Sequence, residues 1–241
     1  MKTILNKILP QKFISFLSFL RELDIFDLYS KKSYSHEGED MILISIFRQK
    51  EKGFYVDVGA HHPKRSSNTY FFYKQRGWSG INIDAMPGSM VLFKAIRARD
   101  INIEAAIAKE RKEMTFFMFQ EPAFNSFDEE LSRQRHKDGT SQIIKEQKII
   151  TKKLEEILTE NLPDGKKIDF LSIDVEGLDL EVLYSNNWQR FRPDYILIEC
   201  LDWDIKKIES NLLYEFLNEK GYDFFAKTFF TVFFKERTLL L

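Results

Sequence analysis

The sequence predicts an α/β fold with a mostly parallel central sheet, a C-terminal antiparallel strand pair and an N-terminal helical extension. The main observation is that, from Gly53 onward, short apolar runs alternate with longer polar segments, as in βα units. In addition, 241 residues with 44% apolar content can bury one sizeable core. We therefore expect residues 1–50 to form a helical extension packed on the core and residues 51–241 to form one ligand-binding domain.

The N-terminal segment predicts helices on either side of Pro10. Apolar residues recur there at helical spacing, namely Ile4, Leu5, Ile8, Leu9, Phe13, Ile14, Leu17 and Leu20. The uncharged run Phe13–Leu20 is too short to span a bilayer, and no small-residue cleavage site follows it. The simpler interpretation is a helix packed on the domain, and the alternative is a basic amphipathic segment resting on a membrane surface.

Five apolar runs predict the parallel strands of the sheet. They are Phe54–Val58, Ile81–Asp84, Ile101–Ala106, Phe170–Asp174 and Tyr195–Glu199. Periodicity also predicts two helices, Leu178–Ser185 after the fourth strand and Ile205–Lys220 after the fifth. The segments Tyr222–Ala226 and Phe230–Lys235 then predict the closing antiparallel pair.

Polar and charged residues interrupt this alternation at about residues 120–151, where Asp138 and Gly139 mark a turn. We expect an insertion between two strands. Insertions at the carboxyl edge of an α/β sheet commonly cover the ligand crevice, so this segment could contact the substrate. The alternative is a solvated helix and loop without a functional role.

The turn after the first strand is the first candidate binding site. Gly59 in this turn lets a ligand approach the backbone. The turn lacks the second and third glycines of G-x-G-x-x-G, which the pyrophosphate of a dinucleotide needs. S-adenosylmethionine (SAM) has no phosphate, and its ammonium group suits the acidic strand end at Asp57.

The next two strands end in residues that suit the nucleoside part of a ligand. Asp84 ends the second strand, where its two oxygens can accept hydrogen bonds from a ribose diol. The alternative is that Asp84 caps the following helix. Glu104 and Ala105 end the third strand, and the small side chain of Ala105 leaves room for an adenine face.

Carboxylates gather at the ends of the fourth and fifth strands. Asp174 and Glu176 follow a strand with apolar residues on both faces, and two such carboxylates need a compensating cation or donor. Asp174, Glu199 and Asp202 could form an oxygen-only site of the kind that Mg²⁺ or Mn²⁺ prefers. Asp202 and Asp204 also match the D-x-D pattern of metal-dependent glycosyltransferases.

Taken together, these motifs resemble the FkbM family of methyltransferases, from about Tyr34 to Glu199. The segments that match are Tyr34–Asp40, Val56–Pro63, Ser67–Tyr70, Gly80–Ala85 and Asp169–Gly177. Several motifs in the right order are far more specific than any one of them. The sequence departs from the family at His36, where the family often has glutamine.

The resemblance implies a Rossmann-like class I methyltransferase fold with SAM as the methyl donor. It also implies O-methylation, which we expect to act on a sugar or a nucleotide-linked sugar in the biosynthesis of a cell-surface polysaccharide or glycoconjugate. The residues expected to bind SAM are Glu39, Asp57, Gly59, Ala60, His61, Asn68, Asp84, Ala85, Glu104, Ala105 and Asp174.

A hydroxyl group that accepts a methyl group has to lose its proton, either to a general base or with the help of a metal. We expect Glu176 to be the base, with His61 as the second choice, and Asp174 to act beside them. If a divalent metal is present, Asp174 and Glu199 are its expected ligands. Three other functions stay open: a nucleotide-sugar glycosyltransferase, an NAD-dependent oxidoreductase and a non-catalytic SAM-binding module.

Composition favours a small-molecule substrate. Lysine plus arginine, 36, nearly cancel aspartate plus glutamate, 37, so the net charge does not indicate a nucleic-acid partner. The single Cys200 cannot form an internal disulfide and stands among apolar residues. We therefore expect a buried thiol and a cytoplasmic protein, while the sequence does not fix the oligomeric state.

Overall fold

A computed structural model describes residues 10–23, 29–201 and 203–238 of the chain. The chain divides into two compact units, Met1–Ser33 and Tyr34–Leu241. In the described part of the chain, no helix is both long enough and apolar enough to cross a membrane.

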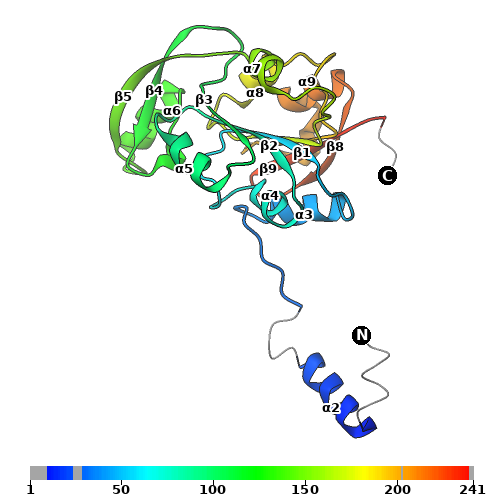
Figure 1. The fold of residues 1–241 in the computed structure, drawn as a ribbon. Helices are drawn as coiled ribbons and strands as arrows, with labels where there is room; N and C mark the ends of the chain where they lie inside the picture. Colours follow the sequence, from blue (N-terminus) through cyan, green and yellow to red (C-terminus); the bar gives the residue numbers. More distant parts are fainter. Residues whose placement is uncertain (1–9, 24–28, 202, 239–241) are drawn as a thin grey trace. The chain divides into compact units, whose positions relative to one another are not determined.

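The first unit contains helix α2, Gln11–Glu22 (Figure 1). Phe13, Phe16 and Phe19 are about half exposed on this helix. The helix predicted after Pro10 is therefore present, whereas the apolar residues of segment 4–9 lie outside the described residues. The predicted packing of an N-terminal extension on the core stays a prediction.

The second unit is built on a seven-stranded mixed sheet with the strand order β3-β2-β1-β6-β7-β9-β8 (Figure 1). The parallel strands are β1 (Phe54–Val58), β2 (Ser79–Asp84), β3 (Ile101–Glu104), β6 (Phe170–Ile173) and β7 (Tyr195–Glu199). The antiparallel pair is β8 (Tyr222–Lys227) and β9 (Thr231–Glu236), with β9 next to β7. The predicted fold class is confirmed, and β1 and β7 have the predicted bounds.

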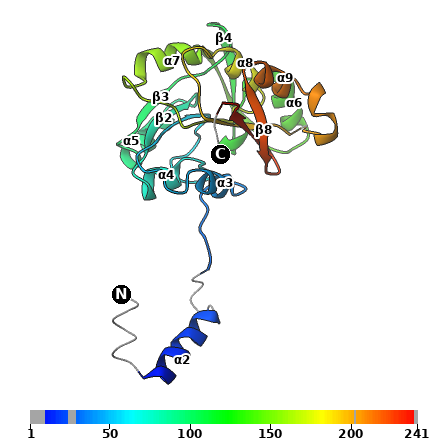
Figure 2. The same cartoon turned by 90° about the vertical axis from the view of Figure 1, so that its right-hand side faces the viewer.

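Helices cover both faces of this sheet (Figures 1 and 2). One face packs against α7 (Leu154–Asn161), α8 (Asp179–Tyr184) and α9 (Leu212–Glu219), and the other against α3 (Glu39–Ile46) and α4 (Tyr70–Gln75). Helix α5 (Ser89–Ile96) lies beside β3.

The strands are buried on both faces because their side chains alternate between two apolar clusters. In β1, Val56 and Val58 join the cluster on the side of α7, α8 and α9, while Tyr55 joins the cluster on the side of α3 and α4. The strand tips are thereby held rigidly by the core. Cys200, just after β7, is buried as predicted, and its thiol forms no disulfide.

The predicted helix over residues 205–220 is interrupted. The structure has a short 3₁₀ segment η2 (Ile205–Ser210), and α9 begins anew after Asn211. The side chain of Asn211 accepts hydrogen bonds from the backbone N–H groups of Leu213 and Tyr214, at 3.0 and 3.3 Å. An N-cap of this kind starts a helix, so the single helix predicted here is wrong.

A second sheet, which the sequence did not predict, separates β3 from α7. Strands β4 (Glu113–Phe119) and β5 (Ile143–Ile150) pair in an antiparallel hairpin. Between them lie the 3₁₀ turn η1 (Pro122–Phe124) and helix α6 (Glu129–Lys137). The sequence does not predict β5 because its charged residues interrupt any alternation of apolar residues, and most residues of this strand are exposed.

Candidate functional site

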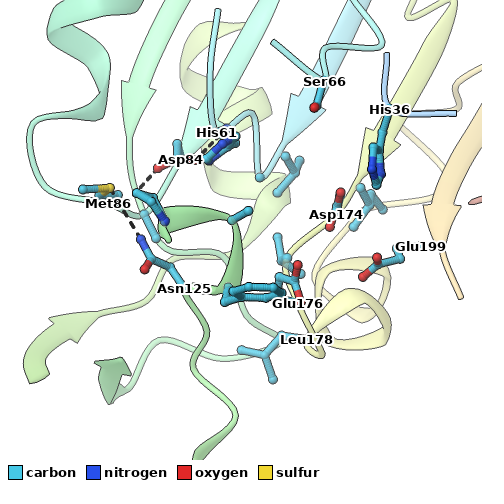
Figure 3. Close-up of a pocket in the computed structure, with 18 of the residues that line it drawn as sticks. His36, His61, Ser66, Asp84, Met86, Asn125, Asp174, Glu176, Leu178 and Glu199 are labelled. Carbon is cyan, nitrogen blue, oxygen red and sulfur yellow. Dashed lines mark hydrogen bonds between the residues drawn. The ribbon is translucent and has the colours of Figure 1, made fainter. Parts of the chain in front are cut away.

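A cavity of about 590 Å³ opens at the carboxyl ends of β1, β2, β6 and β7 (Figure 3). The strand order reverses between β1 and β6, and ligands of α/β sheets bind at such a switch point. Most of the predicted site residues line this cavity, namely Glu39, Gly59, His61, Asn68, Asp84, Ala85, Ala105, Asp174, Glu176 and Glu199. The sequence prediction thus converges on one place.

At Gly59, the turn after β1 lies directly against the turn after β6. Its backbone has φ +82°, and a Cβ atom there would lie 1.7 Å from the carbonyl oxygen of Asp174. No side chain fits at that distance, so only glycine lets the turns after β1 and β6 meet. The cavity floor is therefore bare backbone, which a ligand can approach closely.

Asp84 projects from the tip of β2 into the cavity. Its two carboxylate oxygens accept hydrogen bonds from the backbone N–H groups of His61 and Met86, both at 2.8 Å (Figure 3). Burial raises the pKa of Asp84, and these two hydrogen bonds oppose the shift. Each oxygen keeps a lone pair, so the carboxylate can still accept from a ribose diol. Gly88 rather than Asp84 is the N-cap of α5, so the capping alternative is wrong.

Three of the predicted SAM-binding residues do not line the cavity: Asp57, Ala60 and Glu104. Glu104 is exposed and accepts a hydrogen bond from the backbone N–H of Gly88 at 2.7 Å. Ala60 packs in a small apolar cluster against α5. These three side chains are not part of the cavity wall, and their contacts with SAM stay a prediction.

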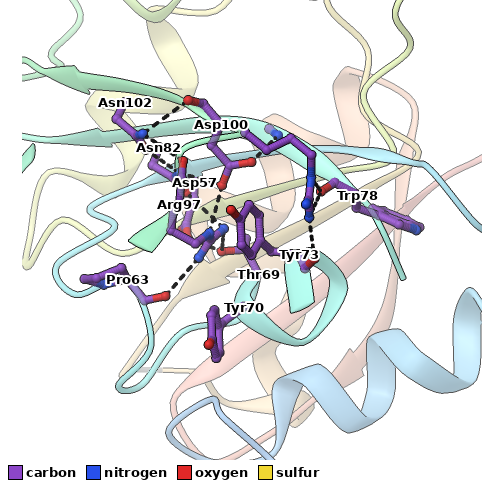
Figure 4. Close-up of polar contacts among 12 residues, drawn as sticks. Asp57, Pro63, Thr69, Tyr70, Tyr73, Trp78, Asn82, Arg97, Asp100 and Asn102 are labelled. Carbon is purple, nitrogen blue, oxygen red and sulfur yellow. Dashed lines mark hydrogen bonds and ion pairs between the residues drawn. The ribbon is translucent and has the colours of Figure 1, made fainter. Parts of the chain in front are cut away.

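Asp57 belongs instead to a buried polar network (Figure 4). It accepts a hydrogen bond from the hydroxyl of Thr69 at 3.0 Å, and the same hydroxyl accepts one from Arg97 at 3.0 Å. Arg97 is fully buried and pairs with Asp100 at 2.8 Å. Burial raises the pKa of Asp57 to about 6, and the positive charge of Arg97 opposes this shift.

This network also explains how the loop after β1 is fixed. Arg97 donates to the hydroxyl of Tyr55 at 2.7 Å and to the carbonyl of Pro63 at 3.1 Å. Tyr55 belongs to β1 and Pro63 to the loop that follows it, so one guanidinium ties the strand to its loop. Arg97 could not be recognised as buried from the sequence, because an arginine is almost never fully buried unless it is paired, and its partners lie elsewhere in the fold.

Three carboxyl groups meet in the cavity at the carboxyl ends of β6 and β7. Asp174, Glu176 and Glu199 each offer an oxygen, and these three oxygens lie within 4.8 Å of one another. Asp174 is open to the cavity but surrounded by protein on its other sides, and burial, followed by the charge of Glu199, raises its pKa well above the usual value. Burial, followed by the charge of Glu176, raises the pKa of Glu199 to about 8. Asp202, the third expected metal ligand, lies outside the described residues.

Glu176 is held in place by the hairpin segment that the sequence did not predict. Its carboxylate accepts a hydrogen bond from Arg135 of α6 at 2.7 Å, and its carbonyl accepts one from the hydroxyl of Ser126 at 2.6 Å. Its backbone adopts φ +54°, which is unusual for a residue with a side chain. The loop is also held by Asp179, which accepts from the N–H groups of Val175 and Gly177, both at 3.2 Å.

Residues 34–40 bind the β8–β9 turn through hydrogen bonds, and we call this set of contacts the clamp. It closes the cavity wall on the side away from Asp84 (Figure 3). Glu37 accepts hydrogen bonds from the hydroxyl of Thr228 at 2.8 Å and from the backbone N–H of Phe230 at 2.7 Å. Glu39 accepts one from the hydroxyl of Thr231 at 3.1 Å. These bonds fix the β8–β9 turn over the cavity.

Aromatic side chains complete the lining. Phe116, Phe124 and Phe127 come from the β4–β5 segment, and Phe230 comes from the β8–β9 turn. His36 stacks on Phe230, with ring centroids 6.1 Å apart and an interplanar angle of 13°. None of these four phenylalanines was predicted as a site residue, because their segments are distant in sequence from the strand tips.

His61, the second candidate base, lies at the rim of the cavity between two charged neighbours. Its ring nitrogen Nε2 is 3.1 Å from a guanidinium nitrogen of Arg65, and its backbone N–H binds Asp84. Burial lowers the pKa of His61, while the charge of Asp84 opposes the shift. His61 is on the side of Asp84, away from Glu199 (Figure 3).

A comparison with models of known protein families identifies the family of this chain. A family model described as the methyltransferase FkbM domain matches residues 57–224, which is more than half of the chain. Among solved structures, the chain is similar to the precorrin-6y C5,15-methyltransferase of Geobacter metallireducens GS-15. The two are 13% identical, with a TM-score of 0.43, and the match covers 88% of this chain and 96% of that one. A comparison with curated protein sequences finds no match.

Proposed function

The chain belongs to the FkbM family of SAM-dependent methyltransferases, and from this premise we propose that it methylates a hydroxyl oxygen of a sugar. The observation that supports a sugar hydroxyl is the cavity itself, in which three carboxylates lie beside aromatic side chains. Carboxylates accept hydrogen bonds from hydroxyl groups and can receive the proton that leaves. Aromatic rings pack against the apolar faces of a substrate.

The residues along the β1–β2–β3 half of the cavity fit SAM. Gly59 leaves the backbone bare, Asp84 can accept from the ribose diol, and Ala105 leaves room beside it for adenine. Asp174, at the switch point, can accept a hydrogen bond from the ammonium group of the methionine part. When bound, SAM supplies an electrophilic methyl group on a positively charged sulfur.

The acceptor oxygen then needs an in-line approach from the other half of the cavity and a group that takes its proton. Glu176 is the base that the sequence predicts, but one oxygen of its carboxylate is already bound by Arg135 at 2.7 Å. Asp174 and Glu199 have raised pKa values and face the cavity. We therefore assign to this pair the role of accepting the proton that the acceptor hydroxyl loses. His61 lies too close to the SAM half for this role.

A divalent metal at the carboxylates is the second candidate arrangement, because three oxygen ligands within 4.8 Å can close around Mg²⁺ or Mn²⁺. One position in this cluster is already occupied by a cation, since Arg135 binds Glu176. We therefore expect methyl transfer to continue in the presence of a chelator. Loss of transfer with EDTA and recovery with Mg²⁺ would instead establish the metal role.

The test is a calorimetric titration with SAM and with its product S-adenosylhomocysteine (SAH), followed by transfer of an isotopically labelled methyl group to a panel of sugars. We expect micromolar binding of both, and a product in which mass-spectrometric fragmentation places the label on a sugar oxygen. Binding of SAM without transfer to any hydroxyl compound would favour a non-catalytic module. If the folded protein binds neither SAM nor SAH but binds a nucleotide sugar with Mn²⁺, the glycosyltransferase alternative replaces the proposal.

A further inference from the structure

The cavity has two halves of different character, and the second half has the features of an acceptor subsite. His61, Asp84 and Met86 lie on one side of the cavity, whereas His36 and Glu199 lie on the other (Figure 3). The first side belongs to the tips of β1 and β2 and fits SAM. The second side, at the tips of β7 and β9, is left for the acceptor.

The acceptor half offers hydroxyl-binding carboxyl groups rather than a site for an anion. Among the described residues, four carboxyl groups line it, those of Glu39, Asp174, Glu176 and Glu199, together with one arginine, Arg135. The guanidinium of Arg135 is already paired with Glu176 at 2.7 Å. Burial and neighbouring carboxylates raise the pKa of Asp174 and Glu199, so these two groups hold their protons near neutral pH. An acceptor with its own phosphate or carboxylate would therefore enter a half whose arginine is already paired.

A stacked pair of rings forms the wall of this half. His36 lies parallel to Phe230, at an interplanar angle of 13°, and both side chains line the cavity. The position of Phe230 is fixed, because its backbone N–H donates to Glu37 at 2.7 Å. The pair therefore offers a preformed flat apolar surface directly beside hydrogen-bond acceptors.

We propose that this half binds an uncharged or amino-substituted sugar ring, which packs against the His36–Phe230 pair and donates its hydroxyl hydrogens to Glu199 and Asp174. This inference rests on the proposed function and narrows it. Nucleotide-linked sugars, sugar phosphates and uronic acids are excluded as acceptors, because the negative charge of each finds no unpaired arginine or lysine among the described residues that line this half. The acceptor is thus a free glycoside or the uncharged residue of a glycan.

The test measures binding of matched glucose derivatives to the SAH-saturated protein by ligand-observed NMR. The uncharged probe is methyl α-D-glucopyranoside and the amino probe is methyl α-D-glucosaminide. The anionic probes are methyl α-D-glucuronide, glucose 1-phosphate and UDP-glucose. We expect the first two to bind at least tenfold more tightly than the anionic three. Equal or tighter binding of an anionic probe, or binding of none of the five, would overturn the inference.

Two variants test where the sugar ring binds. Phe230→Leu and His36→Gln should each weaken the binding of methyl α-D-glucopyranoside at least fivefold and leave the affinity for SAH unchanged. The matched control is Phe229→Leu, because Phe229 is the sequence neighbour, is 76% exposed and does not line the cavity. If Phe229→Leu and Phe230→Leu bind the probe alike, the inference is wrong.

The outcomes separate this inference from the proposed function. Methyl transfer to a sugar oxygen could be unchanged by Phe230→Leu and His36→Gln, or could be faster with UDP-glucose. Either result would show that the proposed subsite is wrong and would leave the proposed function intact. Transfer of the methyl group to a nitrogen or carbon of a non-sugar acceptor overturns both.

Discussion

At the scale of single residues, the cavity depends on one position where two turns of the backbone touch. Gly59 combines a left-handed backbone with a contact that no side chain can make, since its Cβ would meet the carbonyl of Asp174. These two constraints differ in kind. Backbone strain costs about 1–2 kcal/mol for an ordinary residue, whereas the steric overlap has to displace the loop after β6.

We expect Gly59→Ala to weaken SAH binding at least tenfold and to lower the melting temperature, because Asp174 must move away. The matched control is Gly77→Ala. Gly77 has a similar φ of +64°, but nothing lies within 4 Å of the added methyl group. The control should lose about 1–2 kcal/mol of stability and keep its SAH affinity. Calorimetry and thermal unfolding measure both, and equal SAH affinities for the two variants would contradict the role of the contact.

At the scale of elements, the β4–β5 segment acts on the site through helix α6. This helix brings Arg135 to Glu176, while its neighbour Arg133 points outward and pairs with Glu129 and Glu146. The hydroxyl of Ser126 holds the same loop by its backbone. Glu176 would otherwise be free to leave its left-handed conformation, so the segment orients a strained loop.

Arg135→Met should lower kcat/KM for methyl transfer about tenfold, which corresponds to about 1.4 kcal/mol of transition-state stabilisation. The reason is that Glu176 loses the guanidinium that its carboxylate contacts and reorients beside the acceptor. Arg133→Met on the same helix serves as control and should keep the wild-type rate, since Arg133 is about half exposed. Steady-state kinetics of both variants test this, and equal rates would show that α6 has no influence on the site.

The strand tips could be predicted from the sequence, but the walls of the cavity could not. Asp174 follows a run that is apolar on both alternations, and Asp84 follows the short run that contains Ile81 and Ile83; such runs show where a buried strand ends. The contact from Glu37 to Phe230 spans 193 residues, and no local pattern reports a partner so distant. Arg135 likewise stands among exposed charges on a polar helix, and only its contact with Glu176 distinguishes it.

At the scale of the whole molecule, carboxyl groups with raised pKa values collect at one edge of the sheet. Burial is the first cause in every case, and it raises the pKa to about 6 for Asp57 and Asp179 and to about 8 for Glu199. Each group holds its proton in the folded protein over a pH range in which the unfolded chain releases it. The stabilisation is complete below the unfolded pKa and is lost as pH rises through the folded pKa.

The unliganded protein should therefore become less stable as pH rises from about 5 to about 8.5. Glu199→Gln should flatten this decline, because a neutral amide has no proton to lose. The control is Glu219→Gln on α9, an exposed position whose curve should follow the wild type. Thermal unfolding at several pH values measures the effect, and parallel curves for wild type and Glu199→Gln would refute the assignment of the slope to this carboxyl.

The clamp between residues 34–40 and the β8–β9 turn also limits how early the cavity can be completed during synthesis of the chain. Its contact from Glu37 to Thr228 joins residues 191 positions apart. At a synthesis rate of about 5–20 residues per second, roughly 10–40 s pass between the translation of its two halves. During that interval the nascent chain can assemble its first strands around the cofactor half, while the wall of the acceptor half does not yet exist. The wall of the acceptor half can therefore form only after Thr228 has been translated, well after the first strands of the sheet.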